Sequence, residues 1–329
     1  MGTTTTLGPS AGSLAGSRSF LSRLRNGDEI ARLITFLFAA TTVLLTVWLV
    51  FELWQQSALS RHKFGLDFLI TRVWDPVNEE FGALPFVYGT LVTSGVSLLL
   101  AVPLGLGAAI FLAELAPQKI SDTLQFFIDL LAAVPSVIYG LLGIFIVVPL
   151  MRTTIEPALK TTLGFLPIFQ GPAYGIGFLT AGIVLAIMVI PYIVSVSREI
   201  LLAVPREQRE AALALGATRW ESTWKVVVPF ARTGIMGSIF LALARALGET
   251  MAVAMVIGNT PKISASLFAP GYSIAAVIAN EFTEATGDVY LHALVELGLV
   301  LFLLTFILNG LARLLIVLTT QKGSGTGHA

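Results

Sequence analysis

The chain has 329 residues, of which 55% are hydrophobic and 12% are charged, and its formal net charge is zero. Soluble domains carry about 25% charged residues, so this composition excludes an ordinary water-exposed surface and favours lipid as the main solvent. Zero net charge gives no electrostatic reason to bind nucleic acid. The chain contains no cysteine, which excludes disulfides and thiol chemistry, and its three histidines show no metal-ligand spacing.

Residues 1–32 are predicted to form an N-terminal tail in the cytoplasm. The part up to about Asn26 is rich in Ser, Gly and Thr and lacks an apolar region ahead of a cleavage site, so it does not read as a signal peptide. Six apolar segments of about 20 residues follow, each long enough to cross a bilayer as a helix: Leu33–Leu53, Val87–Ala113, Leu124–Leu150, Ile176–Val196, Gly234–Ile257 and Leu291–Ile316.

These segments predict an all-α polytopic membrane protein, with a six-helix transmembrane domain over 33–318 and a C-terminal tail over 319–329. If the N-terminus is inside, lysine and arginine in the connecting segments favour the inside by about two to one. An even number of spans then places both termini in the cytoplasm. The loop over 198–232 holds six of the inside basic residues.

Glycine and proline are frequent in and beside these segments. Both are tolerated in membrane helices, where small residues allow close helix packing. Five glycines are predicted to allow such approach: Gly105, Gly107, Gly140, Gly143 and Gly237. Four prolines interrupt the segments or mark their ends: Pro103, Pro135, Pro149 and Pro191. Between the last two spans, Tyr272–Phe282 is predicted to be an interfacial or re-entrant helix.

The loop over 198–232 contains a predicted short helix. Residues 206–215 are rich in strong helix formers, Pro205 suits the start of the helix, and Glu207 suits the positive end of its dipole. Gly216 is placed to end the helix in the left-handed conformation. A short helix with a small-residue face and charged ends fits a groove on a partner protein. The alternative is a surface helix that lies on the membrane interface.

The fifth apolar segment contains two ionisable residues, Arg245 and Glu249, at a spacing that predicts one helix face. Such residues are costly in a membrane and usually face an interior or a water-filled cavity. Two interpretations remain open. The pair neutralises itself and makes the helix insertable, or the arginine lines the path of an anion, since its planar guanidinium matches phosphate oxygens.

Three classes of function fit these observations. The first is a transport subunit without catalytic chemistry, whose motor is another chain, because no GxxxxGK[ST] phosphate loop is present. The second is a secondary transporter driven by protons or sodium, although such carriers usually show internal repeats. The third is a membrane enzyme, which would need a convergent cluster of acidic residues or histidines that the sequence does not show.

The cytoplasmic loop resembles the EAA loop of ABC importer permeases. It reads Glu210-Ala211-Ala212-x-x-x-Gly216, then nine residues, then Val226-x-Val228-Pro229, where the family has E-A-A-x-x-x-G, nine residues and I-x-L-P. The resemblance implies that this loop is the coupling helix, which sits in a cleft of a separate ATPase subunit. Glu210, Ala211, Ala212 and Gly216 would then contribute to coupling.

Two further stretches, Pro135–Leu141 and Arg245–Val253, resemble phosphate ABC permeases of the PstC type, and the likeness extends over roughly 88–313. The resemblance implies a type I importer permease in the bacterial cell membrane, with Arg245 and Glu249 on the substrate pathway. It implies no catalysis and no cofactor in this chain, since ATP and Mg²⁺ belong to the ATPase. The implied partners are a PstA-type permease, two PstB-type ATPases and a PstS-type phosphate-binding protein. Sulfate and molybdate remain alternative substrates.

Overall fold

Six helices in the described part of the chain are long and apolar enough to span a membrane. The computed structural model describes residues 28–321, and its contacts divide the chain after Glu52 into two compact parts. The six candidate spans confirm the predicted all-α fold: Glu29–Gln56, Leu84–Leu115, Ser136–Leu163, Phe178–Leu202, Arg219–Leu247 and Asp288–Leu314. Residues 1–27 and 322–329 of the two predicted tails lie outside the described residues.

The first span lies in α2 (Asp28–Gln56), an uninterrupted helix of 29 residues. Its threonines bond to their own helix. The hydroxyls of Thr35, Thr41 and Thr46 each donate to the carbonyl oxygen four residues earlier, at 2.8, 2.8 and 2.9 Å. Such bonds satisfy polar side chains without water, which suits a helix surrounded by lipid.

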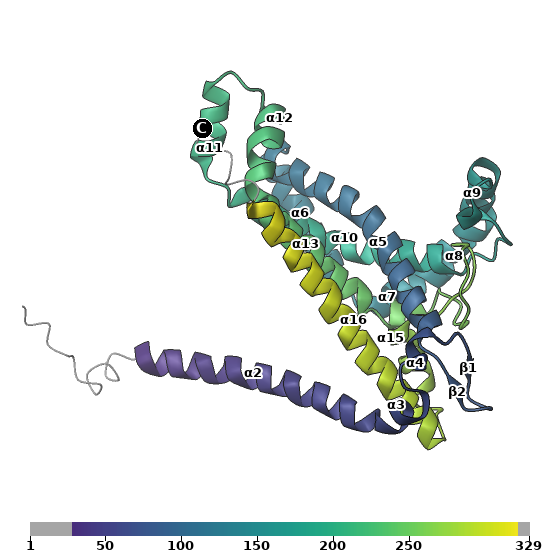
Figure 1. Cartoon of the computed structure of the whole chain (residues 1–329). Helices are drawn as coiled ribbons and strands as arrows, with labels where there is room; N and C mark the ends of the chain where they lie inside the picture. Colours follow the sequence, from purple (N-terminus) through teal and green to yellow (C-terminus); the bar gives the residue numbers. More distant parts are fainter. Residues whose placement is uncertain (1–27, 322–329) are drawn as a thin grey trace, which may run out of the picture. The chain divides into compact units, whose positions relative to one another are not determined.

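The second part of the chain is organised around α10 (Phe178–Leu202), the most buried of the candidate spans in the described residues. This helix packs against α5 (Leu84–Ile110) and α13 (Val228–Leu247), as Figure 1 shows. Pro191 lies inside α10 and Pro103 inside α5, and both helices continue through them. Neighbouring helices can re-satisfy the backbone groups that a proline leaves unpaired.

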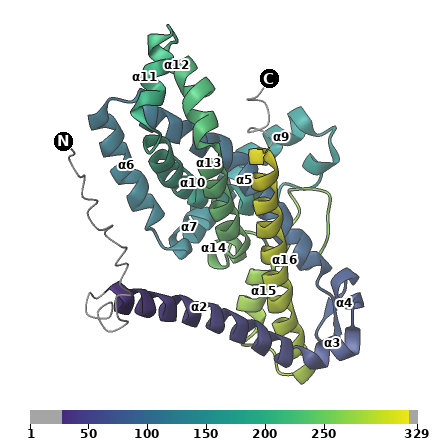
Figure 2. The ribbon, with the colours of Figure 1, turned by 60° about the vertical axis from the view of Figure 1, so that its left-hand side comes forward.

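The segments that join the spans gather at the two ends of this core. Figures 1 and 2 both place α11 (Arg206–Ala214) and α12 (Arg219–Ser222) at one end. The opposite end holds α3 (Ala58–Phe64), α4 (Asp67–Ile70), α15 (Ile274–Glu281) and an antiparallel hairpin of β1 (Trp74–Asp75) and β2 (Glu80–Phe81). α15 confirms the helix predicted within Tyr272–Phe282.

A carboxylate on α15 holds the end with the hairpin together. Glu281 Oε2 accepts a hydrogen bond from Trp74 Nε1 at 2.8 Å and another from the Tyr290 hydroxyl at 2.6 Å. Tyr290 belongs to α16 (Asp288–Gln321), so the hairpin, α15 and the last span meet at one acceptor.

Tyr272, which precedes α15, carries a neutral hydroxyl. Burial raises the pKa of Tyr272 to about 12, and its hydroxyl oxygen accepts a hydrogen bond from Asn280 Nδ2.

The predicted bounds of the third span, Leu124–Leu150, are wrong, because the span runs over Ser136–Leu163. The chain forms α6 (Gln118–Ala132), breaks, and begins a second helical run at Ser136. Pro135 explains the break, because its ring prevents continuation of the preceding helix and pushes Val134 out of helical geometry. The second run holds α7 (Ser136–Leu142), η2 (Gly143–Val147), α8 (Val148–Leu150), η3 (Met151–Ile155) and α9 (Glu156–Leu163), with η2 and η3 π-helical. It therefore extends past the predicted end at Leu150, as far as Leu163.

The fifth predicted span, Gly234–Ile257, is also wrong at both ends. Helical structure runs from Arg219 through α12, the π-helical η5 (Thr223–Val227) and α13 to Leu247. Gly248 follows as the C-cap, and glycine is a poor helix former. A separate short helix, α14 (Met251–Ala254), begins after this break.

Three of the five predicted close-packing glycines lie at tight contacts. A Cβ at Gly105 would lie 2.9 Å from Ile193 Cβ, and one at Gly143 would lie 2.7 Å from Val256 Cγ1. A Cβ at Gly140 would meet the Met255 sulfur. At the other two, Gly107 and Gly237, a Cβ would meet no described atom within 4 Å, so their predicted role in close packing stays a prediction.

Gly105 and Gly107 provide a matched test on one helix. Gly105→Ala should destabilise the protein by about 1–3 kcal/mol, since the added methyl group overpacks the α5–α10 contact at a rigid β-branched residue. Gly107→Ala should be neutral or slightly stabilising, because alanine is the better helix former. The thermal unfolding midpoint of the detergent-purified protein measures both effects. Equal losses in the two variants would contradict the assigned packing.

Candidate functional site

The α11–α12 segment is held by two capping structures. Gly216 follows α11 with φ of +88°, its N–H donates to Leu213 O at 3.0 Å, and Ala217 N–H donates to Ala212 O at 3.1 Å. This pair of bonds is the Schellman motif. Thr218 and Glu221 then form a capping box that starts α12. The structure confirms the predicted helix and its glycine terminator, and the caps define the turn between the two helices.

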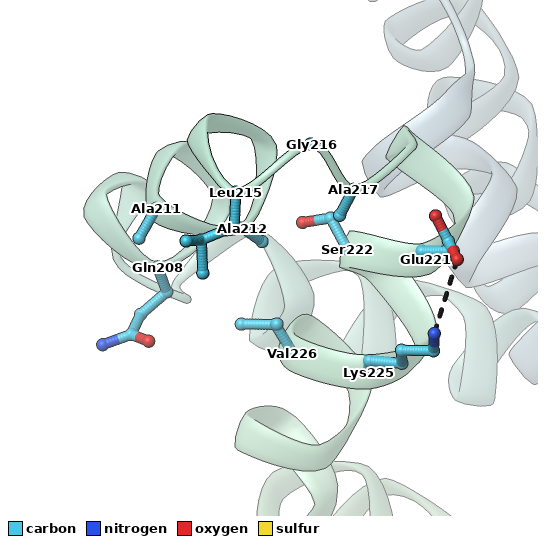
Figure 3. A pocket seen from close by; sticks show the side chains of 10 residues that line it. All are labelled: Gln208, Ala211, Ala212, Leu215, Gly216, Ala217, Glu221, Ser222, Lys225 and Val226. Carbon is cyan, nitrogen blue, oxygen red and sulfur yellow. Dashed lines mark hydrogen bonds and ion pairs between the residues drawn. The ribbon is translucent and has the colours of Figure 1, made fainter.

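An open groove of about 490 Å³ lies between α11 and the start of the next span. Ala211, Ala212 and Gly216 line it from one side, and Figure 3 shows Val226 and the Glu221–Lys225 ion pair on the other. Glu210 does not line this groove and instead borders a second recess, near Arg206. The structure therefore brings three of the four predicted coupling residues together and places the fourth elsewhere on α11.

An ion pair that sequence reasoning missed anchors α11 to the membrane helices. Arg209 Nη2 lies 2.7 Å from Glu114 Oε1 and also donates to Leu201 O at 2.6 Å. Glu114 belongs to η1 (Phe111–Leu115), the π-helical end of the second span, and both side chains are mostly buried. Because the partners are 95 residues apart, no local pattern could have revealed the contact.

Loss of this anchor should loosen α11. In Arg209→Gln the Glu114 carboxylate keeps a buried charge without its partner, a change that costs about 3–5 kcal/mol when a pair is fully buried, and the two carbonyl bonds at the end of α10 weaken. We expect faster amide hydrogen exchange over 206–217 than in the native protein. In Lys225→Gln, which removes only an exposed pair, exchange should change little. Unchanged exchange in Arg209→Gln would contradict the anchoring role.

Arg245 and Glu249 both line a third hollow, an open recess of about 600 Å³ that is distinct from the two beside α11. The remaining wall comes from the α6–α7 junction at 132–136, from Tyr192 on α10, and from Ala244 and Gly248. The guanidinium carbon of Arg245 lies 4.0 Å from the centre of the Tyr192 ring. Arg245 Nε is buried and has no hydrogen-bond partner, and no described residue accepts a hydrogen bond from the Arg245 side chain.

The predicted placement of Arg245 and Glu249 on one helix face is wrong. Arg245 lies in the last turn of α13, whereas Glu249 follows the C-cap, Gly248. No ion pair within 4.0 Å joins them in the described structure, and Glu249 Oε1 instead accepts from Ala252 N–H at the start of α14, at 3.3 Å. Neutralisation by Glu249 therefore does not explain how Arg245 is accommodated in a membrane segment. Arg245 lines the recess as a cation whose N–H groups have no hydrogen-bond acceptor among the described residues.

Polar contacts join α6 to α10 next to the recess, whose wall includes Ala132 of α6 and Tyr192 of α10. The Tyr192 hydroxyl donates to Ala132 O at 2.8 Å. One turn further along α10, the Ser195 hydroxyl donates to Asp129 Oδ1 at 2.6 Å, and Gln125 Nε2 donates to the same carboxylate at 2.7 Å. Sequence reasoning had not singled out Tyr192 or Ser195, because both lie in a uniformly apolar segment without a motif.

The described residues offer no metal centre, since no group of three or more His, Cys, Asp or Glu side chains in 28–321 is placed to hold an ion.

Residues 101–317 match the family model of the binding-protein-dependent transport system inner membrane component. The class of protein is therefore a multi-pass membrane permease of a binding-protein-dependent transport system.

Curated relatives define the family within this class. The phosphate transport system permease protein PstC of Mesorhizobium japonicum is 45% identical over 294 residues, which cover 88% of this chain and 90% of the relative. The protein of the same name from Xylella fastidiosa (strain Temecula1) is 49% identical over 262 residues, 78% of this chain and 81% of the relative. The chain belongs to the PstC family of phosphate transport system permease proteins.

Solved structures support the fold alone. A chain of a bacterial ABC transporter involved in the import of the acidic polysaccharide alginate is similar with a TM-score of 0.54, at 16% identity, over 88% of this chain and 98% of that chain. A chain of the bacterial alginate ABC transporter in complex with an alginate pentasaccharide-bound periplasmic protein is similar with a TM-score of 0.55, at 14% identity, over 92% of this chain and 100% of that chain. The six-span architecture is thus that of an ABC importer permease.

Proposed function

We propose that this chain forms part of the phosphate pathway of an ATP-driven importer. The observation that carries the proposal is Arg245, a membrane-segment arginine that lines an open recess with no acceptor for its N–H groups among the described residues. Guanidinium groups bind phosphate oxygens through paired, charge-assisted hydrogen bonds. The PstC relatives, named for phosphate transport, favour phosphate as the anion.

Glu249 has a different proposed role from that of Arg245. Its carboxylate lines the same recess but caps α14, so it shapes the wall of the pathway and adds a negative charge near the bound anion. A carboxylate beside an arginine weakens the net attraction for an anion. In this proposal Arg245 binds phosphate, and Glu249 limits how tightly it is held.

The α11–α12 groove is the proposed contact with the motor. Ala211, Ala212 and Gly216 present small groups at an open concave surface, and Leu215 beside them is 90% exposed. An exposed leucine at a groove fits a site that a partner covers. A separate ATPase subunit, which binds ATP and Mg²⁺, is the proposed occupant, and Arg209 transmits its movement to η1 and α10.

The proposed complex contains this chain, a PstA-type permease, two PstB-type ATPases and a PstS-type binding protein. Both termini and the α11 end lie in the cytoplasm, in agreement with the distribution of basic residues. The hairpin end faces the binding protein. This chain itself is non-catalytic and holds no cofactor. Cysteine accessibility of single-cysteine variants provides a test of orientation, since the native chain has none.

Uptake of labelled phosphate tests the proposal. A host that lacks this gene should take up phosphate poorly at low external concentration, and restoring the gene should restore phosphate uptake but not sulfate or molybdate uptake. Rescue of another oxyanion instead would replace phosphate as the substrate. Phosphate uptake that depends on a proton or sodium gradient and persists without the ATPase subunit would favour a secondary transporter.

A further inference from the structure

Arg245 has an aromatic partner where a carboxylate would be expected. A charged side chain in a membrane segment usually pairs with an opposite charge or a backbone carbonyl. Here the guanidinium carbon lies over the Tyr192 ring, 4.0 Å from its centre, and no described carboxylate lies within 4.0 Å of the guanidinium. A cation over an aromatic face is attracted by the charge distribution of the ring, most strongly in desolvated sites.

The geometry of this contact matters for anion binding. All five N–H donors of a guanidinium point outward within its plane and seek oxygen acceptors, whereas an aromatic ring attracts the cation through its π face and offers no such oxygen. The Tyr192 ring therefore stabilises the cation without using a donor. A carboxylate partner would occupy the in-plane edge and compete directly with an incoming oxyanion.

Tyr192 is itself held in place. Its hydroxyl donates to Ala132 O at the end of α6, and the Ser195–Asp129 bond one turn away joins the same two helices. The ring lies on α10, the most buried of the described spans. Because the Ser195–Asp129 bond joins α6 and α10 independently of the Tyr192 hydroxyl, the ring should keep its place on α10 when that hydroxyl is removed.

We infer that Tyr192 is a positioning residue for Arg245: its ring replaces a counter-ion, fixes the guanidinium at the recess and leaves the in-plane donors free for an oxyanion. The inference rests on the proposed function, and it assigns a role to a residue outside the two family-like stretches, Pro135–Leu141 and Arg245–Val253. It predicts that the aromatic ring of Tyr192, and not its hydroxyl, supports transport.

Two kinds of variant separate ring from hydroxyl. Tyr192→Phe keeps the ring and removes the bond to Ala132, and phosphate uptake should stay within about twofold of the native value. Tyr192→Leu and Tyr192→Met remove the aromatic face, and uptake should fall by about five- to thirtyfold with normal amounts of assembled complex. Tyr139→Phe is the matched control, since Tyr139 makes a similar hydroxyl bond, to Leu131 O at 2.7 Å, and should also retain uptake.

The outcomes distinguish the inference from the proposed function. Equal losses in Tyr192→Phe and Tyr192→Leu would assign the effect to the hydroxyl bond and overturn the inference. Native uptake in both Tyr192→Leu and Tyr192→Met would overturn it as well, as would loss of the assembled complex in both, which indicates a role in folding. Failure of the native gene to restore phosphate uptake would instead overturn the proposed function.

Discussion

Arg245→Gln should lower phosphate uptake by more than about tenfold while the complex assembles at its normal level. Glutamine can still donate hydrogen bonds but lacks the positive charge, and hydrogen bonds to charged groups contribute about 1.5–3 kcal/mol each. Since Arg245 makes no ion pair in the described structure, its removal leaves no buried carboxylate uncompensated. The loss should therefore appear in uptake and not in stability.

The matched control for this experiment is Arg232→Gln, an exposed arginine on the same helix that does not line the recess. Its uptake should remain within about twofold of the native value, as is usual for exposed substitutions away from a site. Collapse of the complex in Arg245→Gln would assign a structural role to the arginine. Full uptake in that variant would remove Arg245 from the pathway.

Gly216→Pro should separate ATP hydrolysis from phosphate movement. Gly216 has φ of +88° and donates its N–H to Leu213 O, whereas proline requires φ near −65° and has no N–H to donate. The Schellman turn is then lost, and α11 loses its fixed relation to α12. Uptake by reconstituted complexes should fall below about a tenth of the native value, with ATPase activity retained.

Gly216→Ala provides a graded comparison at the same position. A Cβ at Gly216 meets nothing within 4 Å, so only the left-handed backbone penalises alanine, by about 1–2 kcal/mol. We expect a partial loss of uptake, between those of the native protein and Gly216→Pro. Glu210→Lys, on the part of α11 outside the groove, should also weaken coupling. Full uptake in both Gly216→Pro and Glu210→Lys would exclude the coupling role.

The sequence predicted features that depend on local pattern. Six apolar segments gave six spans because crossing a bilayer requires a long apolar helix. The helix at 206–214 was predictable from its helix formers and from Gly216. The predicted boundaries of the third and fifth spans were wrong where the apolar sequence continues through a break in the helix, at Pro135 and at Gly248. Hydropathy alone does not report such breaks in backbone geometry.

Contacts between distant segments could not be predicted in this way. Glu114 and Arg209 lie on different segments and meet only after the spans pack. The contact of Arg245 with the Tyr192 ring depends on the crossing of α13 and α10. Even the prediction that Arg245 and Glu249 share one helix face was wrong. The helix ends at Gly248, between the two residues, and this break removes the helical spacing on which the prediction rested.

The π-helical turn η5 marks a place where the gene for this protein could lose one codon. The run from Arg219 to Leu247 is helical throughout, with η5 between α12 and α13. A π turn closes i→i+5 hydrogen bonds where an α turn closes i→i+4 bonds, so it holds one extra residue. A one-residue deletion within 223–227 would therefore convert η5 to α-helix and leave α12 and α13 in register. The same deletion inside α13 would rotate the parts on either side by about 100° relative to each other, and it should be tolerated far less well.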